Sequence, residues 1–240
     1  MKILLIGYGK MGKTIEQIAL ARHHTIPHKI DVQNTNELKN IRQPTVDVAI
    51  EFTQPDSAFD NIKTCLQNGI PVVSGTTGWL HRKNEIEKIC IENDGAFFYA
   101  SNFSIGVNLF FHLNKILARI MNNLPQYDVS MEEIHHTAKK DAPSGTAITI
   151  AEGILENIKR KNRWTLGLST DKNELSLFAK RIDPFPGQHS VLYSSPIDSI
   201  EIKHTAHSRE GFAAGAVTAA EWLVGKKGIF GMEDMLRFDS

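Results

Sequence analysis

The stretch that decides the fold is Lys2-Ile3-Leu4-Leu5-Ile6-Gly7-Tyr8-Gly9-Lys10-Met11-Gly12, near the start of a 240-residue chain. Its apolar half is typical of a buried strand, and its glycine half fits the pattern G-x-G-x-x-G. Apolar residues then recur at helical spacing over residues 11–22. A strand, a glycine loop and a helix in this order predict a nucleotide-binding βα unit.

Each glycine of this loop has its own physical role. Gly7 permits a tight turn, Gly9 leaves room for a pyrophosphate, and Gly12 lets the helix pack closely on the strand. The amides at the helix start would hold phosphate oxygens. Asp31, at the end of the next predicted strand, would accept hydrogen bonds from an adenosine ribose and disfavour a 2′-phosphate. Taken alone, such a loop could be an ordinary strand-to-helix turn.

Short β-rich runs continue to alternate with helical stretches, and the predicted strands are 2–6, 29–32, 46–52, 71–74 and 96–100. Parallel strands with crossover helices form a doubly wound sheet. Gly75-Thr76-Thr77-Gly78 follows one strand at the carboxyl edge, where such sheets bind ligands, although it could also be a simple turn.

The pattern changes after Asn102. Residues 105–124 predict one long amphipathic helix, and the runs 127–134, 175–182, 190–194 and 199–205 alternate as strands do. Ala-rich segments at 212–223 and 232–236 predict helices that pack back on the first domain. We therefore expect an α/β fold: a Rossmann-type dinucleotide-binding domain at 1–103, completed by helices within 207–240, and an α+β domain with a mixed or antiparallel sheet at 104–206, for substrate binding and oligomerisation.

Composition excludes several classes of protein. Lys plus Arg and Asp plus Glu both number 27, so no overall field would gather nucleic acid. Cys65 and Cys90 are too few for a disulfide framework and are expected to be buried. No apolar stretch approaches the roughly 20 residues of a membrane span, and the N-terminal run is too short for a secretory signal. We expect a cytoplasmic protein that binds neither nucleic acid nor membrane.

The densest polar segment is Glu132-Glu133-Ile134-His135-His136-Thr137-Ala138-Lys139-Lys140-Asp141-Ala142-Pro143-Ser144-Gly145-Thr146, before a predicted helix at 147–158. Paired imidazoles and ammonium groups would make a cationic pocket and supply a proton donor. With Pro143 in the first helical turn, the amides of the three residues after it could hold a carboxylate. The segment predicts an acidic substrate.

Purely structural roles also remain open for residues of this segment, whereas two further kinds of chemistry are disfavoured. Asp141 could simply cap the helix, and the histidines could be solvated residues at a strand end. We expect no metal site, because H-E-x-x-H and cysteine pairs are both absent. A serine hydrolase is also disfavoured, since Ser144 is not part of G-x-S-x-G.

Over nearly its whole length the sequence resembles the 4-hydroxy-tetrahydrodipicolinate reductase family, also called dihydrodipicolinate reductases. The segments that carry the resemblance are 7–12, 52–55, 75–78, 102–107, 133–147 and 204–209, with Phe212 and Gly215. The resemblance implies an oxidoreductase that transfers hydride from NADH or NADPH to 4-hydroxy-tetrahydrodipicolinate, or to its dehydrated form. The product is tetrahydrodipicolinate, in diaminopimelate and lysine biosynthesis.

The resemblance also implies roles for individual residues. The catalytic pair is His135 and Lys139. The resemblance and the argument about the helix start together predict which residues contact the small dicarboxylate substrate: His136, Lys139, Ser144, Gly145 and Thr146. The implied cofactor contacts are Gly7, Tyr8, Gly9, Lys10, Met11, Gly12, Asp31, Gly75, Thr76, Thr77, Ala100, Ser101, Asn102 and Phe103. Similar enzymes are homotetramers that associate through the sheet of the second domain.

Two departures from the family bear on the cofactor. The stretch 31–46 is shorter than usual, and the glycine loop lacks one residue of the common version. Val32 stands where an arginine that could bind a 2′-phosphate is common, although Lys10 could partly replace it. These features favour NADH over NADPH.

Two other functions remain open from the sequence. A different Rossmann dehydrogenase, of the homoserine or aspartate dehydrogenase kind, would leave residues 135–146 unexplained. A non-catalytic dinucleotide sensor would keep the glycine loop but would need no paired histidines.

Overall fold

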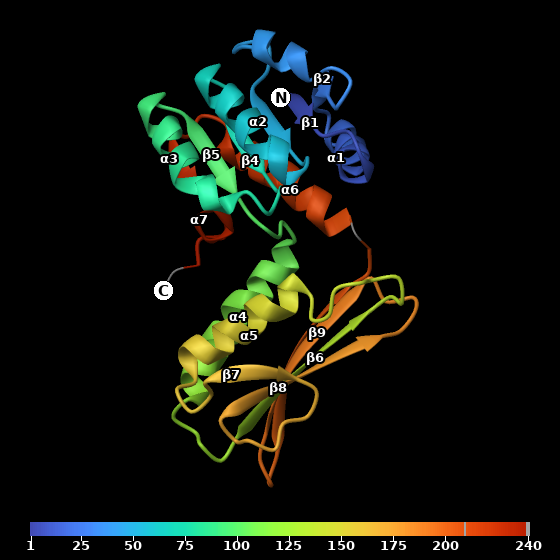
Figure 1. Ribbon diagram of the computed structural model, residues 1–240, viewed down its shortest axis with the longest axis vertical. Coiled ribbons are helices and arrows are strands. Elements are labelled where there is room, and N and C mark those ends of the chain that lie inside the picture. Colours follow the sequence, from blue (N-terminus) through green and yellow to red (C-terminus); the bar gives the residue numbers. More distant parts are fainter. Residues whose placement is uncertain (209, 239–240) are drawn as a thin grey trace. The chain divides into compact units, whose positions relative to one another are not determined.

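A six-stranded parallel sheet organises the first part of the structure, a computed structural model that describes residues 1–208 and 210–238. The strand order is β11-β5-β4-β3-β1-β2. Figure 1 labels β5, β4, β1 and β2 of this sheet. The strands are β1 (Lys2–Ile6), β2 (Thr25–Ile30), β3 (Val48–Glu51), β4 (Val72–Ser74), β5 (Ala96–Tyr99) and β11 (Gly228–Phe230). The helical segments of this part are α1 (Lys10–Ala21), η1 (Thr35–Asn40), α2 (Pro55–Gln67), η2 (Leu80–Arg82), α3 (Lys83–Glu92), α6 (Glu210–Leu223) and α7 (Met232–Leu236).

Helices cover both faces of this sheet, which confirms the predicted doubly wound Rossmann-type architecture. Alternate side chains of β1 serve the two cores. Ile3 and Leu5 pack with α1 and α6, whereas Leu4 and Ile6 pack with α2 and α3. This double burial explains why β1 reads as a continuous apolar run.

The Ala-rich helix α6 approaches the sheet closely because its inner face is made of small residues. A Cβ added to Gly215 would lie 1.8 Å from the carbonyl oxygen of Phe103. The helix therefore lies against backbone at this point, and the C-terminal segment is part of the first unit.

A mixed five-stranded sheet organises the rest of the chain, in the order β10-β9-β6-β8-β7. Its strands are β6 (Asp128–His135), β7 (Arg163–Leu166), β8 (Glu174–Arg181), β9 (Gly187–Ser194) and β10 (Ser199–Ala206). β6 pairs antiparallel with β9 and parallel with β8. The helices α4 (Ile105–Met121) and α5 (Gly145–Asn157) cover one face, over Val129, Met131 and Val191.

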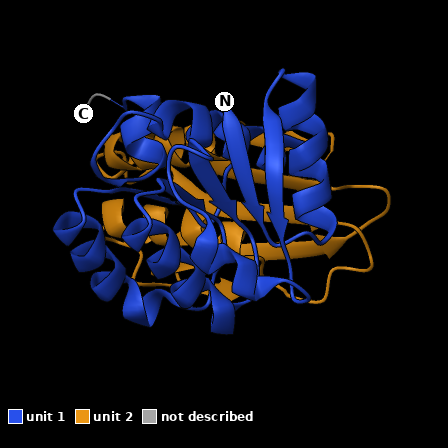
Figure 2. Ribbon diagram, turned by 90° about the horizontal axis from the view of Figure 1, so that it is seen from above, with its two compact units in different colours: residues 1–105, 210–240 blue, residues 106–209 orange. Residues whose placement is uncertain are grey.

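Clustering of contacts divides the chain into two compact units, coloured separately in Figure 2. Unit 1 comprises Met1–Ile105 and Glu210–Ser240, and unit 2 comprises Gly106–Arg209. Cys65 and Cys90 are free and buried, as expected. Within the described residues, no helix is long and apolar enough to cross a membrane.

Several predicted boundaries were wrong. The strand expected at 29–32 is β2, which begins at Thr25 and ends at Ile30. Its start was not predicted because β2 is an edge strand whose polar side chains hide the alternation. The sequence pattern did not predict α3, β7 and β11. β11 has only three residues, and α3 buries only Ile86 and Cys90, so neither shows a clear periodicity. The helix predicted at 105–124 ends at Met121.

Candidate functional site

The glycine loop between β1 and α1 has the geometry that its pattern predicts. Gly7 has a φ of +93°, and a Cβ there would lie 1.9 Å from the carbonyl oxygen of Phe52. A Cβ on Gly12 would lie 2.1 Å from the carbonyl oxygen of Gly7. Around a Cβ on Gly9, by contrast, no atom of the described chain lies within 4 Å. Packing therefore requires two of the glycines, and the third borders open space.

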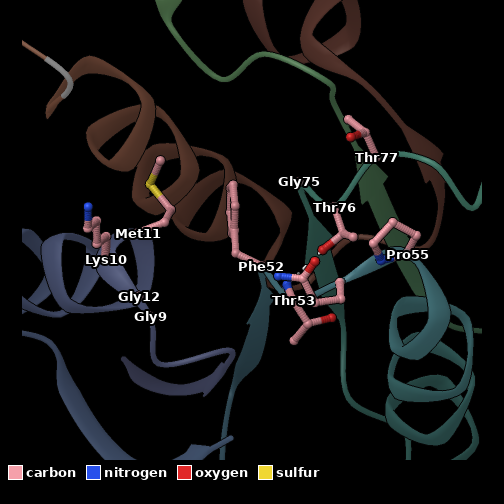
Figure 3. Close-up of a pocket in the computed structure, with 11 residues that line it drawn as sticks. Gly9, Lys10, Met11, Gly12, Phe52, Thr53, Pro55, Gly75, Thr76 and Thr77 are labelled. Atoms are coloured by element: carbon pink, nitrogen blue, oxygen red, sulfur yellow. Dashed lines mark hydrogen bonds between the residues drawn. The ribbon is translucent and has the colours of Figure 1, made fainter. Parts of the chain in front are cut away.

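Two adjoining hollows meet at this loop, and we call them together the dinucleotide groove. The first has a volume of about 480 Å³ and is lined by Gly9, Lys10, Met11, Gly12, Phe52, Thr53, Gln54, Pro55, Gly75, Thr76 and Thr77 (Figure 3). The second has about 380 Å³ and adds Gly7, Tyr8 and Asp31 among its lining residues. Both share Gly9 and the Phe52–Gln54 segment. The groove thus follows the carboxyl ends of β1, β2, β3 and β4, where ligands bind in such sheets.

The start of α1 fits a bound pyrophosphate. Gly9 is the N-cap and has no side chain, and the first turn of the helix contains no acidic residue. The first intrahelical acceptor, the Gly9 carbonyl, serves Lys13, so the amides of Lys10, Met11 and Gly12 have no partner within the helix. Free amides and the positive end of the helix dipole favour an anion here.

Asp31 is held in a turn immediately after β2. Its amide donates to Oδ1 of Asn34 at 2.8 Å, and its carboxylate accepts from the amide of Gln33 at 2.9 Å. Tyr8 lines the same hollow, but its hydroxyl donates to Glu16 and accepts from Lys29. The two carboxylates differ accordingly: that of Asp31 borders the groove, and that of Glu16 is occupied by Lys29 and Tyr8, whose hydrogen bonds lower its pKa.

Four predicted cofactor contacts, Ala100, Ser101, Asn102 and Phe103, line neither hollow. Phe103 lies in the core, where its ring packs against Phe52 and Phe98 at centroid distances of 5.6 and 5.9 Å. Conversely, the segment Phe52–Pro55 lines the groove although the sequence analysis gave it no role. Its position directly after a buried parallel strand was the signal that could have identified it.

The polar segment of unit 2 lies at the carboxyl end of β6. The register of β8 and β9 against β6 determines which further polar residues lie beside it. Glu133 pairs with His189 of β9, and His135 pairs with Arg181 of β8. Oε2 of the fully buried Glu133 lies 3.4 Å from Nδ1 of His135 and 3.6 Å from Nε2 of His189. Arg181 approaches the other carboxylate oxygen at 3.3 Å. Neither Glu133, His189 nor Arg181 was among the predicted site residues, because two of them are contributed by strands far along the chain.

The charge of Glu133 is stabilised by its surroundings. Burial acts to raise its pKa, but the contacts from His135, His189 and the Ser144 amide outweigh it and lower the pKa below the ordinary range. Burial lowers the pKa of His189, which favours its neutral form. A buried carboxylate therefore lies between two imidazoles.

Ser144 links this carboxylate to helix α5. Its amide donates to both oxygens of Glu133 at 3.2 Å, and its hydroxyl accepts from the Ala147 amide at 3.1 Å as the helix N-cap. The expectation that Pro143 lies in the first turn was therefore wrong, because Pro143 precedes the cap. The alternative that Asp141 caps the helix is excluded, since Ser144 is the cap. The amides of Gly145 and Thr146 begin the helix, and a Cβ on Gly145 would meet nothing within 4 Å in the described chain.

Lys139 forms an ion pair with Asp141. Its Nζ lies 2.8 Å from both carboxylate oxygens, and this contact lowers the pKa of Asp141. Arg181 donates to the backbone carbonyls of both residues. The guanidinium therefore fixes the loop that presents the ammonium group. We call His135, His136, Lys139, Ser144, Gly145 and Thr146 the substrate cluster.

A metal ion is not favoured between Glu133, His135 and His189. Glu133, His135 and His189 offer ligand atoms that lie within 4.8 Å of one another. The carboxylate, however, already binds the Arg181 guanidinium and the Ser144 amide. A second cation would have to displace or tolerate that positive charge.

Family comparison decides which proteins this chain is related to. Residues 1–103 match the family profile "Dihydrodipicolinate reductase, N-terminus", and residues 106–236 match "Dihydrodipicolinate reductase, C-terminus". The chain belongs to the dihydrodipicolinate reductase family. Its relatives in this family include a 4-hydroxy-tetrahydrodipicolinate reductase of Christiangramia forsetii, 52% identical over 236 residues and 98% of both chains. Another, of Methanoregula boonei, is 38% identical over 193 residues, 79% of this chain and 74% of the relative.

Solved structures of low identity share the fold. A dipicolinate-bound dihydrodipicolinate reductase from Paenisporosarcina sp. TG-14 matches with a TM-score of 0.78 and 21% identity, over 98% of this chain and 99% of that one. GenD2 from gentamicin A biosynthesis, in complex with NAD, matches with a TM-score of 0.58 and 11% identity, over 94% and 86%. The reductase architecture is thus retained in this chain.

Proposed function

We propose that this chain reduces 4-hydroxy-tetrahydrodipicolinate, or its dehydrated form, to tetrahydrodipicolinate in diaminopimelate and lysine biosynthesis, with NADH or NADPH. The names of its relatives support the reaction. The observation that carries the proposal is the substrate cluster, where imidazole, ammonium and the amino-terminal end of helix α5 follow one strand end. These are the groups that a cyclic dicarboxylate requires.

The substrate cluster would hold the two carboxylates by different means. The amides of Gly145 and Thr146 receive one carboxylate at the positive end of α5. Lys139 exchanges its partner Asp141 for the second carboxylate, and His136 contributes a further polar contact. Because Asp141 holds the ammonium group in place beforehand, little side-chain entropy is lost on binding.

His135 is the proposed proton donor, and Lys139 supports it. Nδ1 of His135 faces Glu133, which leaves Nε2 for proton transfer. Glu133 fixes the orientation of the imidazole, so we assign it a positioning role. Gly187 makes room for the ring, because a Cβ there would lie 3.1 Å from Nε2.

The dinucleotide groove would hold the cofactor, which supplies the hydride when it is bound. The amides of Lys10, Met11 and Gly12 receive the pyrophosphate, and Gly75, Thr76 and Thr77 form the far wall. Asp31 accepts from the adenosine ribose and would repel a 2′-phosphate, so we propose a preference for NADH. Contacts of Tyr8 and of the Ala100–Phe103 stretch remain predictions from the family.

We further propose a cytoplasmic homotetramer. Two free, buried cysteines suit a reducing compartment. The helices of unit 2 cover one face of its sheet, and the other face has a hollow of about 290 Å³ lined by residues that include Phe178 and Leu192. Edge strand β10 has unpaired backbone groups beside this face.

The deciding experiment follows oxidation of NADH, and separately NADPH, by absorbance. The substrate is generated enzymatically from aspartate semialdehyde and pyruvate. We expect rapid oxidation, faster with NADH, and a loss of turnover of about 10²-fold or more in His135→Gln with unchanged cofactor affinity. Cofactor binding without oxidation would instead favour a dinucleotide sensor or another dehydrogenase, and an unchanged turnover in the variant would remove His135 from proton transfer.

A further inference from the structure

A second buried carboxylate, Glu51, lies beneath the dinucleotide groove and has no role in the proposed reaction. It is the last residue of β3 and is fully buried. No Lys, Arg or His of the described chain forms an ion pair with it. The ionisable side chains that face it are Cys65 of α2 and Tyr99 of β5, and burial raises the pKa of both, so neither supplies a compensating charge.

Within the described residues, only neutral donors satisfy this carboxyl group, and they come from the end of β4 and from the loops after β3 and β4. Ser74 donates at 2.6 Å and Thr76 at 2.8 Å. Thr53 donates through its amide at 3.1 Å and also through its hydroxyl. The Thr53 amide also lies 2.8 Å from the Thr76 hydroxyl, so that Glu51, Thr53 and Thr76 form a closed ring of hydrogen bonds.

The ring joins the two walls of the groove. Thr53 follows β3 and Thr76 follows β4, and both line the first hollow, where Figure 3 shows them beside each other. The Thr53 hydroxyl also accepts from Ser57 at 3.1 Å and lies 3.4 Å from the Asn61 amide nitrogen, and these two residues of α2 line the second hollow. A single carboxyl group is therefore linked by hydrogen bonds to residues that line both hollows.

Packing alone does not account for a carboxyl group at this position, because burial raises its pKa even though Ser74, Thr53 and Thr76 donate hydrogen bonds to it. An ionisable group placed in the interior without a cation costs several kcal/mol unless it is neutralised, whereas an apolar side chain would complete the core without that cost. The cost is concentrated directly under the groove. Residues that lower stability at such a place are typical of functional sites.

We propose that Glu51 is a positioning residue for the dinucleotide: without touching the ligand, it holds the Thr53 and Thr76 loops in the conformation that binds the cofactor. This inference rests on the proposed function. Because Glu51 acts through loops of unit 1, replacing its carboxyl group changes cofactor affinity and leaves recognition of the dicarboxylate unchanged.

The test compares Glu51→Gln with Asp47→Asn, which alters a carboxylate at the other end of β3 that accepts only from the Lys2 amide in the contacts described. We would measure the Kd of NADH by cofactor fluorescence, the Kd of dipicolinate by calorimetry, and steady-state KM and kcat. For Glu51→Gln we expect the Kd and KM of NADH to rise about tenfold or more, a loss of roughly 1.4 kcal/mol. The kcat at saturating NADH and the Kd of dipicolinate should stay within about threefold of wild type, and Asp47→Asn should match wild type.

An unchanged Kd of NADH in folded Glu51→Gln would overturn the proposal, and so would a fall in kcat with unchanged KM, which is the signature of a merely structural defect. If Glu51→Gln does not fold, Ser74→Ala decides, since the Ser74 hydroxyl donates to Glu51 but Ser74 lines neither hollow. A rise in the Kd of NADH is expected in this variant too, and its absence overturns the proposal. Wild-type protein that binds no NADH would contradict the proposed function itself, whatever the variants do.

Discussion

At the scale of single residues, Glu133 and its neighbour Glu132 are adjacent carboxylates with opposite surroundings. Glu133 points to the helix-covered face, where Arg181, Ser144 and two histidines surround it. Glu132 points to the other face and pairs with Lys180 near the surface. The alternation of side chains along β6 alone produces this difference. Glu133 and Glu132 are therefore a matched pair for measuring the effect of burial on the stability that a carboxylate contributes.

We expect Glu133→Gln to lower the free energy of unfolding at pH 7 by about 3 kcal/mol, because it leaves the partly buried Arg181 without its charge partner. The folded-state pKa of Glu133 lies below the unfolded value of about 4.5, so the stability it contributes is present above that pH and is lost as the pH falls toward the folded value. Urea unfolding from pH 7 to 3 measures this, and the gap between wild type and variant should narrow below pH 4.5.

The control for this measurement is Glu132→Gln. Its ion pair is partly exposed, so the change in unfolding free energy should be below about 1 kcal/mol at every pH. Equal losses in the two variants, or a gap for Glu133→Gln that does not depend on pH, would contradict the role of buried charge.

The residues of the site were predictable only where neighbours in sequence supply the chemistry. His135, Lys139 and Ser144 could be identified because the segment 132–146 is polar, basic and placed before a helix. Glu51, Arg181 and His189 could not, since an isolated polar residue in a β-rich run carries no local signal. Their significance depends on which strands pair and in what register, and that is a property of the sheet.

At the scale of elements, different glycines of the loop between β1 and α1 serve packing and binding: Gly12 is needed for packing, whereas Gly9 borders the groove. Gly12→Ala should be strongly destabilising, because its Cβ would collide with the Gly7 carbonyl at 2.1 Å. Gly9→Ala should melt within a few degrees of wild type but bind NADH about tenfold more weakly or worse, because its methyl group occupies the space of the pyrophosphate. Thermal melting and cofactor fluorescence measure the two effects. Full affinity in Gly9→Ala would show that the pyrophosphate lies elsewhere.

Elements with strong periodicity were predictable and marginal ones were not. β1 and α7 have the predicted bounds, since an apolar run and a short amphipathic segment signal them directly. β11 has too few residues to show alternation, and its partner β5 lies more than a hundred residues earlier in the sequence. Ser144 caps α5 where Asp141 was considered, because the loop is pinned to Glu133 through the Ser144 amide.

At the scale of the whole molecule, the open face of the unit 2 sheet should mediate assembly. We expect sedimentation equilibrium to give a mass four times the 26.8 kDa of the chain. Leu192→Lys, which places a charge on this face, should shift the protein to smaller species. Ile197→Lys, in an exposed turn of the same unit, is the control and should leave the mass unchanged. A monomeric wild type would refute the tetramer.

The return of the chain to unit 1 also sets an order of events during synthesis. β11 pairs with β5, and α6 packs on α1, yet both segments are synthesised only after the whole of unit 2. Unit 2 lies wholly between the two parts of unit 1 in sequence and can fold while translation continues. Until α6 and β11 emerge, the nascent first unit keeps one unpaired strand edge and one uncovered apolar face. A ribosome that stalls after making unit 2 therefore releases an aggregation-prone product and a target for chaperones and proteases.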